Sequence, residues 1–115
     1  MPPVLYGIRS CDTVRKARRW LDEHASSYDY FDLREDALDA DTVRSWIDRV
    51  GWEQVINRRS TSWKALAPEA RDTMDAESAL AAVMEQPTLV KRPVLVRDRE
   101  LEFGFSPQRY EALFG

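Results

Sequence analysis

Residues 5–21, LYGIRSCDTVRKARRWL, join a short apolar run to an amphipathic helical pattern. The apolar run, residues 4–8, is typical of a buried strand. Ser10 or Asp12 can cap the helix that follows. The apolar residues of that helix recur at helical spacing, with Trp20 beside them: Val14, Ala17 and Leu21. The stretch therefore predicts a strand, a loop and a helix, with Cys11 in the loop where the helix begins.

A second strand and a second helix are predicted after this stretch. The second strand is expected at about residues 28–33. The segment DADTVRSWIDRVGW begins with Asp39, and either Asp39 or Asp41 can cap a helix there. Gly51 suits the residue just past the end of that helix. The apolar stripe of the helix consists of Val43, Trp46, Ile47 and Val50.

The middle of the chain is predicted to be helical with an irregular break. A helical turn is expected over residues 52–56. Residues 57–67, NRRSTSWKALA, are polar with turn character and give no periodic pattern. A further helix near residues 76–86 carries Leu80, Val83 and Met84 and stops at Pro87.

The last part of the chain has the signals of a hairpin followed by a helix. Residues 93–96, PVLV, and 101–105, LEFGF, lie at hairpin spacing around an RDRE turn. Ser106 is expected to cap a final helix, with Pro107 at its first position. Tyr110, Leu113 and Phe114 would pack that helix onto the protein.

The order of these elements predicts the fold class. A βαβ unit, several helices and a ββα unit give an α/β fold with a mixed sheet and helices on its faces. This order is thioredoxin-like, with a helical insert at about residues 40–86 between its two halves. At 115 residues the chain is expected to form one domain, residues 1–115.

The composition of the chain excludes several classes of partner and site. The net charge of −3 gives no reason to expect a nucleic-acid partner, and no apolar run could span a bilayer. One cysteine cannot form an internal disulfide or a cysteine-based zinc site. No acidic residues have metal-ligand spacing, and His24, the only histidine, lies at the far end of the helix from Cys11. We therefore expect a cytoplasmic monomer with no bound metal or cofactor.

Cys11 lies where two physical effects favour a thiolate. The first backbone N–H groups of a helix have no partner within it, and the helix dipole favours negative charge at that end. Arg15, one turn further on, adds positive charge, whereas the neighbouring Asp12 opposes it. The alternative is a buried structural cysteine, because free cysteines are often buried. The position after a strand and at a helix start favours a reactive thiol.

The motifs of the chain resemble a known family. The segments LYGIRSCDTVRKARRWL, NRRSTSWKAL, KRPVLV and GFSPQRYEALF resemble the ArsC/Spx family of thioredoxin-fold proteins, specifically its YffB-like branch. The resemblance covers nearly the whole chain, and it implies that Cys11 is a nucleophile that attacks an oxidised substrate or a disulfide. In the family's arsenate reductases, the cysteine forms an adduct with the oxyanion that glutathione and glutaredoxin resolve. The family's regulators bind RNA polymerase instead.

The resemblance also implies a binding site beside the thiol. In thioredoxin-like folds a cis-proline at the start of the third strand faces the nucleophile, and the resemblance places Pro93 there. Arg92 would then lie beside the thiol, where it can bind an anion or stabilise a thiolate. Without the resemblance, the simpler interpretation is a trans proline at a strand's first residue and a solvated arginine.

Further cations belong to the same candidate site. Arg58 and Arg59 fall in the family's middle arginine segment, and Arg59 is the better match to the pattern of the branches that do not reduce arsenate. Arginine suits oxyanions and carboxylates because its planar fork donates paired hydrogen bonds. A surface loop with two solvated charges is the alternative. Thr13 and Arg15, in the turn after the cysteine, complete the set.

The departures from the family's patterns bear on the reaction. Val14 occupies the position of the second cysteine of a CxxC pair, so a disulfide switch at that site is impossible. Val14 also replaces the serine that stabilises oxyanions in arsenate reductases. Their third arginine is missing from residues 104–106, and Arg109 lies inside the expected final helix. These losses count against arsenate as the substrate.

Two classes of function remain after these observations. The first hypothesis is an oxidoreductase: a glutathione-dependent thiol/disulfide reductase in which Cys11 attacks a disulfide or a glutathionylated target, with glutathione as co-substrate. Arsenate reduction with glutathione and glutaredoxin is the enzymatic alternative. The other class is an Spx-like module that binds RNA polymerase without a CxxC switch.

Overall fold

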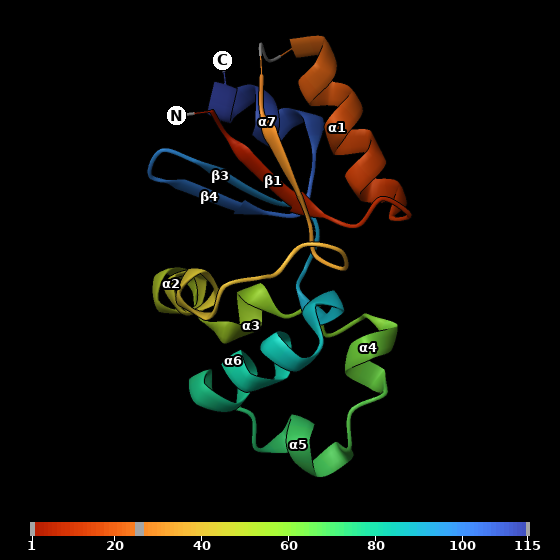
Figure 1. Cartoon of the computed structure of the whole chain (residues 1–115), viewed down its shortest axis with the longest axis vertical. Helices are drawn as coiled ribbons and strands as arrows, with labels where there is room; N and C mark the ends of the chain where they lie inside the picture. Colours follow the sequence, from red (N-terminus) through yellow and green to blue (C-terminus); the bar gives the residue numbers. More distant parts are fainter. Residues whose placement is uncertain (1, 25–26, 115) are drawn as a thin grey trace. The chain divides into compact units, whose positions relative to one another are not determined.

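The computed structural model describes residues 2–24 and 27–114 (Figure 1). They divide into two compact units. The unit that we call the sheet unit takes the chain up to Asp36 and from Arg92 onward, and the helical unit is Ala37–Lys91. The helical unit includes the insert expected at about residues 40–86. Within the described part of the chain, no helix has both the length and the apolar character needed to cross a membrane.

The sheet unit is built on a four-stranded mixed sheet. Its elements are β1 (Val4–Gly7), α1 (Asp12–His24), β2 (Asp29–Asp32), β3 (Val94–Arg97), β4 (Glu100–Phe103) and α7 (Pro107–Phe114). The strand order is β2-β1-β3-β4. β1 runs parallel to β2, whereas β1 with β3 and β3 with β4 are antiparallel. The predicted α/β class with a mixed sheet and βαβ and ββα halves is confirmed.

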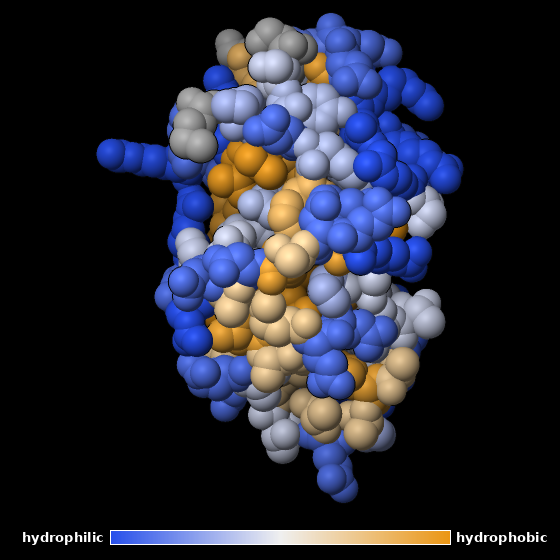
Figure 2. All heavy atoms as spheres, in the orientation of Figure 1, coloured by the Kyte–Doolittle hydropathy of each residue, from blue (hydrophilic) through white to orange (hydrophobic). Residues whose placement is uncertain are grey.

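One face of this sheet is buried under α1 and α7. Leu5 of β1 and Leu95 of β3 are register partners, and they pack with Ala17 and Leu21 of α1 and Tyr110 of α7. Each of these side chains is at most 1% exposed. Complete burial of one leucine stabilises a fold by about 1.5–3 kcal/mol. The periodic residues of the sequence therefore form the core, while the outer side of α1 is hydrophilic (Figure 2).

The helical unit consists of short helices around its own apolar centre. Its elements are α2 (Ala40–Val50), α3 (Trp52–Val55), α4 (Thr61–Lys64), α5 (Pro68–Asp72), α6 (Ala76–Glu85) and the 3₁₀ turn η1 (Pro87–Leu89). Its fully buried side chains include Val43, Val55, Val83, Leu89 and Val90. An isolated bridge between Ile56 and Val90 joins the segment after α3 to the segment after η1.

Local signals that end helices act as the sequence predicts. The side chain of Asp39 accepts a hydrogen bond from the backbone N–H of Thr42 and caps α2. Gly51 follows α2 with a φ of 88°, a conformation that glycine adopts without steric cost. At α7, the Ser106 hydroxyl accepts from the backbone N–H of Arg109 at 3.1 Å, which confirms the predicted cap.

Several expectations differ from the structure. Neither Ser10 nor Asp12 caps α1, because the carbonyl of Cys11 accepts the first helical bond, from Arg15 N–H at 3.0 Å. The last strand ends at Phe103 rather than at residue 105, because Gly104 takes a φ of 86° and turns the chain. Met84 does not join the core and is 36% exposed. The helices α4 and α5 were not predicted, since four or five residues carry too little periodicity.

Candidate functional site

Cys11 lies in the turn between β1 and α1. Its backbone N–H donates to the carbonyl of Ile8 at 3.1 Å, and its own carbonyl accepts the first bond of α1. The residue therefore occupies the N-cap position, next to the backbone donors that the first turn of a helix leaves free. The side chain is a free thiol and is partly exposed. This placement agrees with the expectation that Cys11 begins the helix.

Pro93 lies at the same edge of the sheet as Cys11. β1 and β3 are antiparallel and pair Tyr6 with Val94, so the residue before Val94 lies where β1 leads into the turn of Cys11. The Arg92–Pro93 peptide bond is cis, as the resemblance implies. Pro93 is buried, and its carbonyl accepts from the N–H of Gly104 at 2.9 Å. Arg92 is partly exposed at this edge.

The first turn of α1 adds polar and charged groups around the cysteine. Arg15 donates its Nε to the carbonyl of Arg9 at 3.2 Å, so this arginine braces the turn that precedes Cys11. Asp12 pairs with Lys16 at 3.4 Å, and both side chains are exposed. Thr13 is exposed on the same turn. Arg15 therefore has a second, structural contact that the sequence alone does not indicate.

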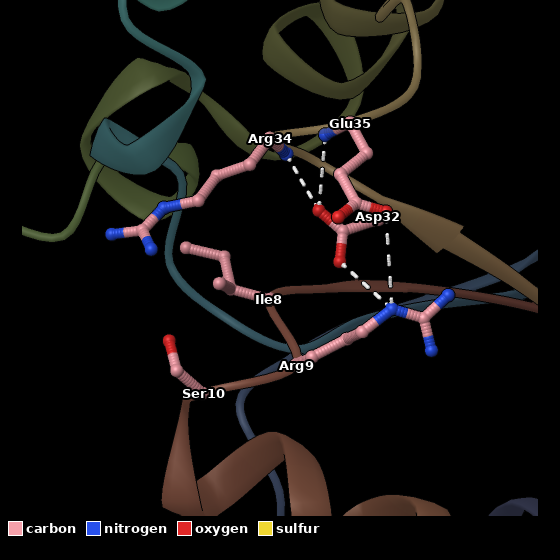
Figure 3. Close-up of a pocket in the computed structure, with 6 residues that line it drawn as sticks. All are labelled: Ile8, Arg9, Ser10, Asp32, Arg34 and Glu35. Carbon is pink, nitrogen blue, oxygen red and sulfur yellow. Dashed lines mark hydrogen bonds and ion pairs between the residues drawn. The ribbon is translucent and has the colours of Figure 1, made fainter.

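Asp32, at the end of β2, is a buried carboxylate that contacts both the turn after β2 and Arg9 in the turn after β1 (Figure 3). It is 3% exposed, and its Oδ1 accepts from the backbone N–H groups of Arg34 at 2.8 Å and Glu35 at 3.1 Å. Its Oδ2 lies 3.7 Å from the Nε of Arg9 and accepts from the hydroxyl of Tyr30 at 3.4 Å. A carboxylate with this many donors is an anchor for the segments that supply them.

The electrostatics of Asp32 follow from its donors. Burial alone would raise the pKa of Asp32, but the backbone N–H groups of Arg34, Glu35 and Arg9, together with the Arg9 charge, outweigh burial and lower the pKa. Tyr30 beside it responds in the opposite direction. Burial first, and then the charge of Asp32, raises the pKa of Tyr30 to about 12. Asp32 is therefore an ionised carboxylate at neutral pH, and Tyr30 is a neutral donor.

A small hollow lies next to this anchor. It has a volume of about 150 Å³ and is lined by Ile8, Arg9, Ser10, Asp32, Arg34 and Glu35 (Figure 3). Arg9 and Asp32 were not singled out in the sequence. The available signal was an aspartate between Phe31 and Leu33, in a segment that otherwise predicts a buried strand.

Arg58 and Arg59 belong to the helical unit. Their loop is shaped by Asn57, whose Oδ1 accepts from the backbone N–H of Arg59 at 3.0 Å. Both arginine side chains are exposed, and with Lys91 they line a cavity of about 360 Å³. Glu53 also lines this cavity, and the excess of three cations over one carboxylate is suited to an anionic ligand. Lys91 is the member of this group that no sequence pattern indicated.

The residues at the family's missing positions have other partners. Val14 is completely buried. Arg109, the arginine near the third-arginine position, donates to the carboxylate of Glu102 from Nε at 3.2 Å and from Nη2 at 3.0 Å. These hydrogen bonds raise the pKa of Arg109 and hold its guanidinium against β4. Among the described residues, no group of three His, Cys, Asp or Glu side chains could hold a metal ion.

Comparison with known sequences places these features in context. Residues 6–113 match the model of the ArsC family. An uncharacterised protein of Haemophilus influenzae is 37% identical over 96% of this chain and 97% of its own length. The global transcriptional regulator Spx of Enterococcus faecalis is 29% identical over 90% of this chain and 79% of its own.

Solved structures agree with these similarities. A protein named YFFB superposes with a TM-score of 0.93 at 38% identity, covering 98% of this chain and 99% of that one. A protein of Brucella melitensis described as related to arsenate reductase gives a TM-score of 0.79 at 44% identity, covering 99% and 95%. The similarities thus extend both to arsenate-reductase-related proteins and to Spx regulators.

Proposed function

Because the chain belongs to the ArsC family, we propose that it is a thiol/disulfide oxidoreductase that uses Cys11 as its nucleophile and glutathione as its co-substrate. The observation that carries this proposal is the position of Cys11. A partly exposed free thiol occupies the N-cap of a 13-residue helix, at the sheet edge where the cis Arg92–Pro93 bond lies. The position leaves the sulfur accessible to a substrate, next to the free backbone donors of the first helical turn.

The reaction proceeds in two exchanges. The Cys11 thiolate attacks the glutathione sulfur of a glutathionylated substrate, which forms a Cys11–glutathione disulfide and releases the substrate as a thiolate. A second glutathione thiolate then attacks the glutathione sulfur of that disulfide, which restores Cys11 and releases glutathione disulfide. The substrate gains two electrons, and the two glutathione units are joined. An external thiol is required because the chain has no second cysteine.

The surrounding residues supply binding and orientation in this proposal. Backbone groups beside Pro93 pair with the peptide of the bound disulfide, and Arg92 binds one of its carboxylates. Arg58 and Arg59, which line a cavity of the helical unit, bind an anionic group there. Thr13 and Arg15 lie in the turn after the thiol, where Arg15 adds a positive charge.

Arsenate reduction is a weaker candidate on the same site. The position of the oxyanion-stabilising serine is held by Val14, which is 0% exposed. The guanidinium of Arg109 is occupied by Glu102. An arsenate adduct on Cys11 would therefore lack two of the polar partners that the family's reductases are expected to use.

A regulatory role has a specific observation in its favour, the 29% identity to Spx of Enterococcus faecalis. It would make the chain a partner of RNA polymerase. A redox switch in this chain would need another mechanism, because the CxxC partner position is Val14.

The decisive experiment measures turnover and adduct formation together. We would follow reduction of a glutathionylated peptide by glutathione, coupled to glutathione reductase, and detect the Cys11–glutathione adduct by intact mass. Cys11→Ser is expected to abolish both signals, while Ser45→Ala, an exposed position on α2, is expected to leave both unchanged. Full activity in Cys11→Ser would overturn the proposal. Arsenate turnover, or capture of RNA polymerase that survives Cys11→Ser, would favour one of the alternatives.

A further inference from the structure

The turn that carries Cys11 is tied to the end of β2 by a single buried side chain. Asp32 is the buried charged residue of the described chain, and it is 3% exposed. It accepts from the backbone of Arg34 and Glu35 in the turn that follows β2, and from the hydroxyl of Tyr30. A second connection runs from Asp32 to the turn after β1 (Figure 3).

That second connection is made through Arg9, two residues before the cysteine. The guanidinium of Arg9, through its Nε, lies 3.7 Å from Oδ2 of Asp32. The guanidinium also lies over the ring of Tyr30, 5.2 Å from its centroid. On its other side, the carbonyl of Arg9 accepts from Arg15 of α1 at 3.2 Å.

Arg9 is therefore held from two sides. Its guanidinium is bound by Asp32 of β2, and its carbonyl is bound by Arg15 of α1. The N–H of Cys11 donates to Ile8, so the turn between residues 8 and 11 is closed as well. Bracing of this kind fixes where the N-cap residue lies relative to the free donors of the helix.

We propose that Asp32 is a positioning residue for Cys11, which acts by fixing Arg9 so that the thiol stays at the N-terminus of α1. Asp32 does not itself touch the substrate in this proposal. The inference rests on the proposed function, in which the Cys11 thiolate is the reactive species. It adds a residue of β2 to a site otherwise built from the segments around Cys11 and Pro93.

The direction in which the Cys11 alkylation rate changes distinguishes a positioning role of Asp32 from a direct effect of its charge. Asp32 is negatively charged, so removing its charge would by itself favour the Cys11 thiolate and speed its alkylation at neutral pH. Loss of position has the opposite effect, because a displaced thiol loses the helix donors that stabilise its charge. Arg9 and Arg34 are the cations, and Glu35 and Asp36 the acids, that adjoin Asp32 in this region.

The test compares Asp32→Asn with Asp29→Asn. Asp29 is exposed on the same strand, and its replacement removes the same unit of charge. We would measure the rate of Cys11 alkylation by iodoacetamide from pH 5 to 9, with circular dichroism to check the fold. Asp32→Asn is expected to slow alkylation at pH 7 by about threefold. Asp29→Asn is expected to match the wild type.

Alkylation of Asp32→Asn that is unchanged or faster would overturn the proposal. Should this variant fail to fold, amide hydrogen exchange in the wild-type protein provides the test. The Cys11 amide is expected to be protected, because it donates to Ile8 in the turn that Asp32 fixes, and exchange at the rate of an open loop would equally overturn the proposal. Failure of the proposed function gives a different result, because the wild-type thiol itself would then react no faster than a free cysteine.

Discussion

A Cβ atom added to Gly7 would lie 2.6 Å from Cγ1 of Val14 and 2.9 Å from its Cγ2. Gly7 is the last residue of β1, and Val14 is a fully buried residue of the first turns of α1. The helix that carries Cys11 at its start therefore packs onto the end of β1 at a distance that only glycine allows. Val14, the residue at the CxxC partner position, is thus a packing residue.

This contact predicts the effect of Gly7→Ala. The new methyl group would overpack the contact with Val14, and we expect the free energy of unfolding to fall by about 1–3 kcal/mol. Adding Val14→Ala to Gly7→Ala should recover part of that loss, so the two changes should be non-additive in a double-mutant cycle. Urea unfolding of the wild type, both single variants and the double variant provides the measurement. Simple additivity would contradict the close packing.

The buried carboxylate of Asp32 predicts how stability depends on pH. Its pKa in the folded protein is lowered from the ordinary value of 3.8, so its contribution is complete above that value. The contribution is lost as pH falls through the lowered pKa, because the folded state must then take up a proton on a group held by donors. Asp32→Asn should cost about 1.5–3 kcal/mol at pH 7.

The loss of stability caused by Asp32→Asn should become smaller in acid. The difference between wild type and Asp32→Asn is expected to shrink as pH falls below 3.8. Asp29→Asn, an exposed change on the same strand, is the matched control and should differ little from wild type at any pH. Chemical unfolding at a series of pH values measures both. A difference that is independent of pH would show that the Asp32 charge is not responsible.

Removing the hydroxyl of Tyr110 is predicted not to destabilise the protein. It is 0% exposed, and its hydroxyl has no hydrogen-bond partner among the described residues. Because a buried hydroxyl without a partner is costly, Tyr110→Phe should leave stability unchanged or raise it by up to ~1 kcal/mol. Tyr28→Phe is the contrasting variant, since the Tyr28 hydroxyl accepts from Arg18 at 3.2 Å, and it should lower stability. Thermal unfolding compares them, and a clear loss in Tyr110→Phe would contradict the expectation.

The cations of the helical unit predict a change in binding without a change in thiol reactivity. Arg58→Gln and Arg59→Gln should raise KM for a glutathionylated substrate severalfold, because each removes a donor for a carboxylate. Neither should alter the alkylation of Cys11. Arg44→Gln is a matched control in the same unit, since Arg44 is an exposed residue of α2 that pairs with Glu77 at 3.3 Å. An unchanged KM in both variants would contradict a role of these arginines in substrate binding.

Much of the fold could be predicted because its signals are local. Helix α1 is visible in the spacing of Val14, Ala17 and Leu21, all of which are 0% exposed. The caps at Asp39 and Ser106 needed only the residue type and its position. The helices α4 and α5 could not be predicted, because α4 has four residues and α5 has five, too few to show a periodic face.

The candidate site likewise has features that the sequence predicts and features that depend on tertiary packing. The sequence by itself determined that Cys11 would follow a strand and begin a helix, because a strand, a turn and a helix are each encoded by neighbouring residues. Only the tertiary structure decided that Asp32 would bind Arg9 and that Val14 would lie against Gly7. These contacts join residues far apart along the chain or on successive elements, so they depend on how strands and helices pack rather than on any local pattern.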